Sequence, residues 1–130
     1  MNRRGRAVFG LMLLAGCANA PPRDRQSVMT TLYFGLTRPG GTVIADAEWQ
    51  SFVEQEVVPR FPAGFTVLNG EGAWREQQQT IREPTRLIVV IRRGTAELDA
   101  AIDALRAAYC RRFNQESVMR VDQDVRRGAF

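Results

Sequence analysis

Hydrophobic and polar residues alternate between Thr30 and Leu36, and a period of two is typical of a β-strand with one buried face. The apolar face of this strand would carry Leu32, Phe34 and Leu36. The run Arg38–Gly41, which contains a proline and two glycines, then ends the strand.

The period changes to that of a helix after residue 46. Asp46 is a residue type that caps helices, so we predict a helix that begins at Ala47 with Asp46 as its cap. Pro59 ends this helix, because the residue before a proline avoids helical backbone angles. Its apolar stripe would be Trp49, Phe52, Val53 and Val57.

Two further strands are predicted in the middle of the chain. The first runs over 65–68, is interrupted by a turn or bulge at Asn69–Gly72, and resumes at 74–76. Residues 77–80 would form the tip of a hairpin, and Ile81 begins the return strand. Its segment Arg86–Ile91 is apolar on both faces, as a central strand covered on both sides would be.

The end of the chain predicts a second helix and a fourth strand. Gly94–Thr95 opens the helix and Asn114 ends it. Residues 117–121 form the strand, and a polar end follows from Asp122. The buried stripe of the helix would contain Leu98, Ala101, Ile102, Leu105, Ala108 and Tyr109.

The predicted order of elements, βαββαβ, is that of the ferredoxin-like α+β fold. This fold is an antiparallel four-stranded sheet with two helices on one face. Since the central strand is apolar on both faces, the face without helices would expose an apolar patch, and such patches usually mark a partner. We therefore expect a homodimer in which sheet faces meet; the alternative is a terminal segment that folds over the face.

The N-terminus predicts export and lipid anchoring. Three arginines in MNRRGR precede the apolar run LMLLAGC, a pattern typical of a secretion signal and too short for a membrane-spanning helix. Leu14–Cys17 resembles a bacterial lipobox, which implies cleavage before Cys17 and acylation of that cysteine with fatty acids such as palmitate. An ordinary signal peptide cut nearby is the alternative.

This interpretation divides the chain into a lipoprotein signal peptide (residues 1–16), a lipidated tether (17–27) and a single α+β domain (28–130). Ala18, rather than aspartate, follows the cysteine and favours the outer membrane, facing the periplasm. Removal of the signal peptide lowers the net charge from +4 to +1, because it takes away three arginines and no acid. The mature chain therefore lacks the basic excess of a nucleic-acid binder.

Several classes of chemistry are excluded by composition. The chain has no histidine, so it has no histidine base and no histidine metal ligand. Cys110 would be the only cysteine left beside the lipidated one, so no internal disulfide is expected, and we expect its thiol to be partly buried. No phosphate-binding loop with its lysine is present, and we predict no cofactor and no metal.

The remaining candidates are aromatic, acidic and arginine side chains. Trp74 and Arg75 lie in the glycine-rich segment GEGAWRE, where an exposed ring and a cation suit a binding groove, although the sequence favours a packing role in the hairpin for Trp74. Arg60 and Glu116 each follow a helix, and we expect them to meet at one end of the sheet, as a salt bridge or a polar pocket. Trp49, in contrast, is expected in the core.

Glu76 and Glu83 are a candidate pair of carboxylates. Glu76 and Glu83 would face each other across the hairpin if its tip is 77–80, and two close carboxylates suit acid–base catalysis. The neighbouring Arg75 and Arg82 favour an ordinary solvated surface instead.

Several phrases of the sequence resemble a family of bacterial proteins. The resemblance covers roughly residues 28–130, and its most specific motifs are Pro59–Val67 and Phe113–Val118. They are similar to the family of domains of unknown function numbered 3574. The resemblance implies an exported bacterial protein, often lipid-anchored, and it supplies no activity or catalytic residue.

Three functions remain open from the sequence. The first is a binding or envelope-associated domain whose ligand surface contains Arg60, Trp74, Arg75, Glu116 and Tyr33. The second is a small cofactor-free enzyme with a pocket between helices and sheet, in which Tyr33 and Glu116 serve as acid and base. The third is a structural lipoprotein whose open sheet face binds a different protein.

Overall fold

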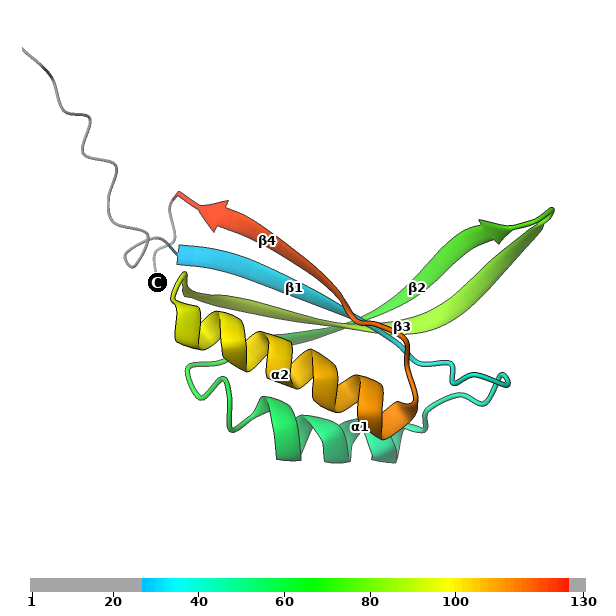
Figure 1. Cartoon of the computed structure of the whole chain (residues 1–130), viewed down its shortest axis with the longest axis horizontal. Coiled ribbons are helices and arrows are strands. Elements are labelled where there is room, and N and C mark those ends of the chain that lie inside the picture. Colours follow the sequence, from blue (N-terminus) through cyan, green and yellow to red (C-terminus); the bar gives the residue numbers. More distant parts are fainter. Residues whose placement is uncertain (1–26, 127–130) are drawn as a thin grey trace, which may run out of the picture.

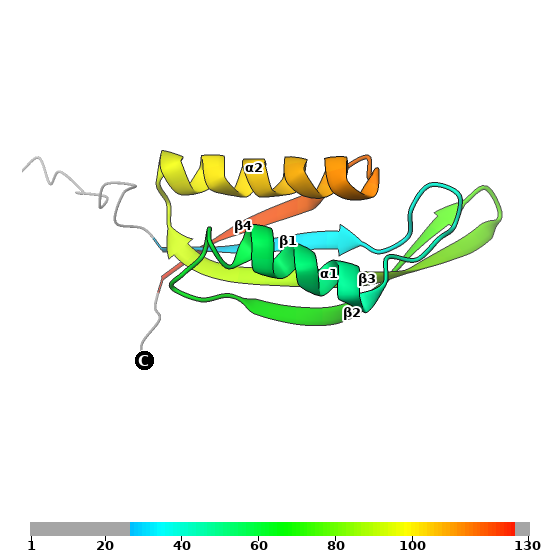
Figure 2. The same cartoon turned by 90° about the horizontal axis from the view of Figure 1, so that it is seen from below.

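The computed structural model describes residues 27–126, which form one sheet with two helices packed on it (Figures 1 and 2). The sheet has the strand order β2-β3-β1-β4, and every neighbouring pair is antiparallel. This confirms the predicted ferredoxin-like fold. The elements are β1 (Ser27–Gly35), α1 (Asp46–Phe52) with its π-helical extension η2 (Val53–Val57), β2 (Thr66–Glu76), β3 (Gln79–Arg93), α2 (Ala96–Phe113) and β4 (Met119–Val125).

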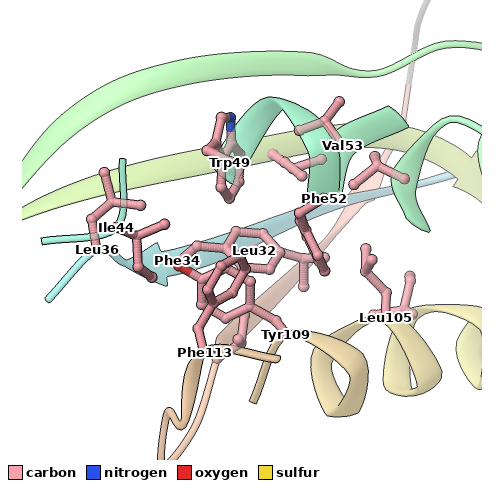
Figure 3. Close-up of a cluster of buried hydrophobic side chains, with 14 of the residues drawn as sticks. Leu32, Phe34, Leu36, Ile44, Trp49, Phe52, Val53, Leu105, Tyr109 and Phe113 are labelled. Carbon is pink, nitrogen blue, oxygen red and sulfur yellow. The ribbon is translucent and has the colours of Figure 1, made fainter. Parts of the chain in front are cut away.

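The hydrophobic core lies between the sheet and the two helices, which both cover the same face (Figure 2). Its centre is a cluster of aromatic rings in edge-to-face contact (Figure 3). The Phe34 ring lies 4.7 Å from that of Tyr109 and 5.4 Å from that of Trp49, between centroids. Such pairs add attraction beyond the area they bury. Trp49 is therefore a core residue, as predicted.

The first helix begins one residue earlier than predicted, and Asp46 is not its cap. Ala45 takes the capping position with extended backbone angles, and its N–H donates to Glu48 Oε2 at 3.0 Å. That hydrogen bond, together with the one from Arg38, holds the pKa of Glu48 below its ordinary value. Asp46 lies in the first helical turn and pairs with Arg86 at 2.8 Å.

The β2–β3 hairpin differs from its prediction in two respects. The expected interruption at 69–72 is absent, because Gly70 and Gly72 stay in continuous register opposite Thr85 and Glu83. The turn contains two residues rather than four, since Glu76 already pairs with Gln79. Gln77 makes this tight turn possible with a left-handed backbone at φ 53°. The hairpin extends and curves away beyond the other strands (Figure 1).

The second helix has the predicted ends, whereas the last strand lies further along the chain than predicted. The Thr95 hydroxyl caps α2 by accepting from the Leu98 N–H at 3.3 Å, and Asn114 ends it in the left-handed conformation. Val118 belongs to the core instead of the strand. Pairing with β1 begins at Met119, and the polar residue Asp122 lies inside β4 because its carboxylate accepts from the Thr30 hydroxyl at 2.6 Å.

The second face of the sheet is apolar and is covered by no element among residues 27–126 (Figure 2). Strand register places one row from each strand on this open face. Ile91, near the end of β3, is 59 % exposed. The apolar part of the open face comprises Met29, Thr31 and Tyr33 of β1, Leu68 of β2, Leu87, Val89 and Ile91 of β3, and Met119 and Val121 of β4, and the polar residues Ser27, Thr66, Arg93 and Gln123 lie on the same face.

No helix within the described residues is long and apolar enough to cross a membrane. The predicted signal peptide and almost all of the tether, including Cys17, lie outside the described residues.

Candidate functional site

A wide hollow of about 1170 Å³ lies where the hairpin passes the end of β1. Its floor comes from the open face, and its walls come from the hairpin, the loop at 37–40 and the connector at 114–117 after α2. The β2–β3 hairpin, which extends and curves away beyond the rest of the sheet (Figure 1), supplies one wall of the hollow. Polar and apolar groups share its lining, among them Tyr33, Trp74, Glu83, Thr85, Gln115 and Glu116.

Glu83 is the best-positioned carboxylate of the hollow. Its Oε1 accepts a hydrogen bond from the Thr37 backbone N–H at 2.9 Å. The carboxyl group lies directly over Gly35, where a Cβ atom would come within 2.7 Å of Oε1 and 2.9 Å of Oε2. Only glycine permits this approach. No partner for Oε2 is found within residues 27–126, and no side-chain oxygen there is both buried and unpartnered, so Oε2 is open to the hollow.

The backbone beneath Glu83 is fixed from behind by two side chains. The Tyr109 hydroxyl donates to the Gly35 carbonyl at 2.7 Å, and Gln115 Nε2 donates to the Thr37 carbonyl at 3.0 Å. Burial, and then the nearby charge of Glu83, raise the pKa of Tyr109, so its hydroxyl remains a neutral donor. These contacts hold the end of β1 against α2 and its connector.

Charges in the hollow are unevenly paired. Its two arginines both have acidic partners outside the lining: Arg38 pairs with Glu48 at 2.7 Å, and Arg82 pairs with Glu71. The acids that line it are Glu76, Glu83 and Glu116, and none of them forms an ion pair within the described part of the chain. The hollow therefore presents carboxylates whose charge is not neutralised locally.

The structure brings three of the five predicted site residues together. Tyr33, Trp74 and Glu116 line the hollow, and Trp74 is 46 % exposed. Arg75 is not part of the lining, and it lies opposite Thr80 on the other face of the hairpin from Trp74.

The expectation that Arg60 meets Glu116 was wrong. The connectors after α1 and α2 lie at opposite ends of the sheet, because the two helices run in opposite directions (Figure 1). Arg60 instead binds the carboxylate and the backbone carbonyl of Glu56, one turn earlier, at 2.7 Å each.

Strand register also corrects the proposed carboxylate pair. Glu76 lies opposite Gln79, and Glu83 lies opposite Gly72, so the two acids do not face each other. Sequence analysis noticed Glu83 only as a member of this pair and missed its contact with Gly35. The glycine in an otherwise regular strand pattern was the available signal, because it indicates a close approach by another group.

A second cluster missed by sequence analysis lies at the opposite end of β1. Arg92, whose side chain is 3 % exposed, donates to the Thr30 hydroxyl and to Asp99. Arg120 of β4 binds both Asp99 and Asp122. Every charged group in this cluster has an opposite partner, so we interpret it as structural.

Potential metal ligands and the Cys110 thiol are scattered in the described part of the chain. No three potential metal-ligating side chains gather there. Cys110 is half-buried beside the core, as expected.

The fold and the hollow define a ferredoxin-like α+β domain with an acid-lined cavity at the end of its sheet. Within that class, the chain belongs to the family described as "Protein of unknown function (DUF3574)", whose model matches residues 29–128. This confirms the family resemblance seen in the sequence. A search of curated proteins finds no match.

Solved structures share the fold at low sequence identity. A phage SAM lyase in its apo state has a TM-score of 0.58 and 17 % identity, over 76 % of this chain and 81 % of that one. The same type of enzyme in complex with S-methyl-5′-thioadenosine has a TM-score of 0.52 and 18 % identity, over 75 % and 81 %. CutA1 from Oryza sativa has a TM-score of 0.52 and 8 % identity, over 82 % and 86 %. At these identities the likeness shows the fold alone.

Proposed function

We propose that this protein is a lipid-anchored domain of the bacterial cell envelope that binds a small organic ligand in the hollow around Glu83. The observation that carries the proposal is the position of the Glu83 carboxylate, which is fixed over Gly35 with one oxygen bonded and the other open. A preorganised polar group beside exposed aromatic side chains is the usual composition of a ligand site.

The anchor is supported by the lipobox-like sequence Leu14–Cys17. A short polar tether then leads to the domain, and Ala18 favours the outer membrane, with the domain in the periplasm. Cells that express the full chain and receive labelled palmitate should yield labelled protein. Cys17→Ala should abolish the label, whereas Cys110→Ser should keep it; label that persists without Cys17 would contradict the anchor.

Native mass spectrometry tests ligand binding. A Cys17→Ser form, exported through an ordinary signal peptide and purified gently from the periplasm, should carry extra mass from a retained ligand. Trp74→Ala removes an exposed ring of the hollow and should reduce that extra mass. Val43→Ala, an equally exposed apolar position outside the lining, should not. Extra mass retained equally by both variants would place the ligand elsewhere.

We further propose that two copies of the chain associate through the part of the open face that does not line the hollow. This part is formed by Met29, Leu68, Leu87, Val89, Ile91 and Val121, and Ile91 is 59 % exposed. The chain itself offers little to cover it: residues 17–26 contain no large apolar side chain, and residues 127–130 contain only one. A second copy supplies a second apolar surface of the same kind.

A cofactor-free enzyme is the second candidate, favoured by the presence of both Tyr33 and Glu116 in the same hollow. In this role a carboxylate accepts a proton and a hydroxyl donates one. S-adenosylmethionine is the first substrate to test, because SAM lyases share the fold. Incubation should then release S-methyl-5′-thioadenosine in a Glu116-dependent manner, and unchanged S-adenosylmethionine would exclude this activity.

A further inference from the structure

We infer that the ligand of the hollow is a small organic cation, such as a quaternary ammonium compound. The inference rests on the proposed ligand-binding function and narrows it to one chemical class. Three features of the hollow support it: the pairing of its charges, the aromatic side chains in its lining and the wide spacing of its carboxylates.

The pairing of charges leaves only negative charges unpaired in the lining of the hollow. Arg38 and Arg82 reach its edge, but Glu48 and Glu71 neutralise them from outside the lining. Glu83 keeps Oε2 open, and Glu76 and Glu116 add two further carboxylates on opposite walls. An anion entering this space meets no unpaired cation among the described residues, whereas a cation meets three carboxylates.

The aromatic side chains explain why an organic cation fits better than a neutral polar molecule. Trp74 and Gly72 are two residues apart on β2, so they share a face, and Gly72 lies opposite Glu83. The Trp74 ring is therefore a diagonal neighbour of Glu83 on the same face of the hairpin. Tyr33 lines the floor nearby. The negative faces of such rings attract cations, most strongly when little water intervenes.

The spacing of the acids argues against an inorganic cation. A bare divalent ion requires several oxygen ligands converging within about 2.6 Å of it. No such group of three carboxylates exists among residues 27–126. Carboxylates spread around a hollow of about 1170 Å³ suit a larger ion whose charge is carried within an apolar shell.

A matched pair of probes isolates the role of charge. Choline and 3,3-dimethylbutan-1-ol have nearly the same shape, but only choline carries a charge. Each probe is titrated into the Cys17→Ser protein while the two tryptophan indole N–H signals are followed by NMR. Trp74, 46 % exposed, reports on the hollow, and Trp49, 2 % exposed, serves as the internal reference. We expect choline to shift the Trp74 signal with at least about tenfold higher affinity than the neutral alcohol.

Two variants test whether Glu83 supplies the attraction. Glu83→Gln removes the charge and keeps an oxygen that can accept from the Thr37 N–H, and it should weaken choline binding about tenfold while leaving the alcohol unchanged. Glu54→Gln makes the same charge change at an exposed position outside the lining and should have no effect. Equal affinities for both probes would overturn the cation inference while preserving a ligand site. No Trp74 shift with either probe would overturn the inference as well, and retained ligand in native mass spectra would then decide separately on the proposed function.

Discussion

Gly35 and Glu83 depend on each other more closely than any other pair in the hollow. A methyl group at position 35 would come within 2.7 Å of Glu83 Oε1, so Gly35→Ala must displace the carboxylate and weaken its bond to the Thr37 N–H. We predict a loss of about 1 kcal/mol in the free energy of unfolding, measured by urea denaturation, because the carboxylate lies at the end of a flexible side chain and can move away at the cost of its hydrogen bond.

Two further variants separate this contact from a general effect of glycine replacement. At Gly72 the new methyl group would make an ordinary contact of 3.4 Å with Thr85 Oγ1, so Gly72→Ala should be tolerated. In a Glu83→Ala background the obstructing carboxylate is gone, and Gly35→Ala should cost much less. An equal cost in both backgrounds would show that the predicted clash is not its cause.

The role of a residue could be predicted from the sequence where hydrophobic spacing determines it. It could not be predicted where the role depends on which residues of two strands pair. Trp49 and Tyr109 follow directly from helical spacing, since an apolar stripe must face the core. Glu83 depends on pairing between strands, and a single-residue difference in hairpin length changes every partner. A tip at residues 77–80 would pair Glu83 with Trp74, and the observed two-residue turn pairs it with Gly72, so neither hairpin places Glu83 opposite Glu76.

At the scale of elements, the order and type of the helices and strands were predictable from sequence. The central segment Arg86–Ile91 indicated its position by being apolar on both faces, and it lies between β1 and β2. The exact ends of the helices and strands were harder to predict. The predicted position of β4 was too early in the chain, because the polar residue Asp122 was taken to lie beyond the strand. In the structure, Asp122 lies inside β4, where it bonds to Thr30 and Arg120.

The cluster of Arg92, Arg120, Asp99 and Asp122 joins β3, α2 and β4, and Thr30 links it to β1. This cluster predicts sensitivity to acid. Hydrogen bonding from Arg120, together with the charge of Arg92, holds the pKa of Asp99 below its ordinary value. Burial acts to raise the pKa of Asp122, but hydrogen bonds from Arg120 and Thr30 outweigh it, and the net shift is downward.

A carboxyl group with a lowered pKa in the folded state stabilises the protein above its ordinary pKa, and this contribution disappears as the pH falls through the lowered value. The free energy of unfolding should therefore decline as the pH drops below 3.8, the ordinary pKa of aspartate. Urea denaturation over a pH series measures this decline. Asp99→Asn should flatten it, whereas Asp124→Asn, at an exposed position in β4, should not. A decline equally steep in Asp99→Asn would contradict the assignment.

At the scale of the whole molecule, the open face predicts self-association. Ile91→Glu places a charge on the most exposed large apolar side chain of this face and should convert the proposed dimer into a folded monomer, as measured by analytical ultracentrifugation. Val43→Glu is the matched control, because Val43 is similarly exposed at 53 % but lies outside the sheet. A wild-type protein that sediments as a single chain at all concentrations would contradict the dimer.

The chain belongs to a family of unknown function, and the function that we propose depends on what occupies the space around Glu83. The most direct measurement is a crystal structure of the Cys17→Ser protein purified gently from the periplasm. We predict electron density for a small molecule beside Glu83 Oε2 and in contact with the Trp74 ring. A hollow filled only by water, or closed by the protein's own side chains, would contradict the account.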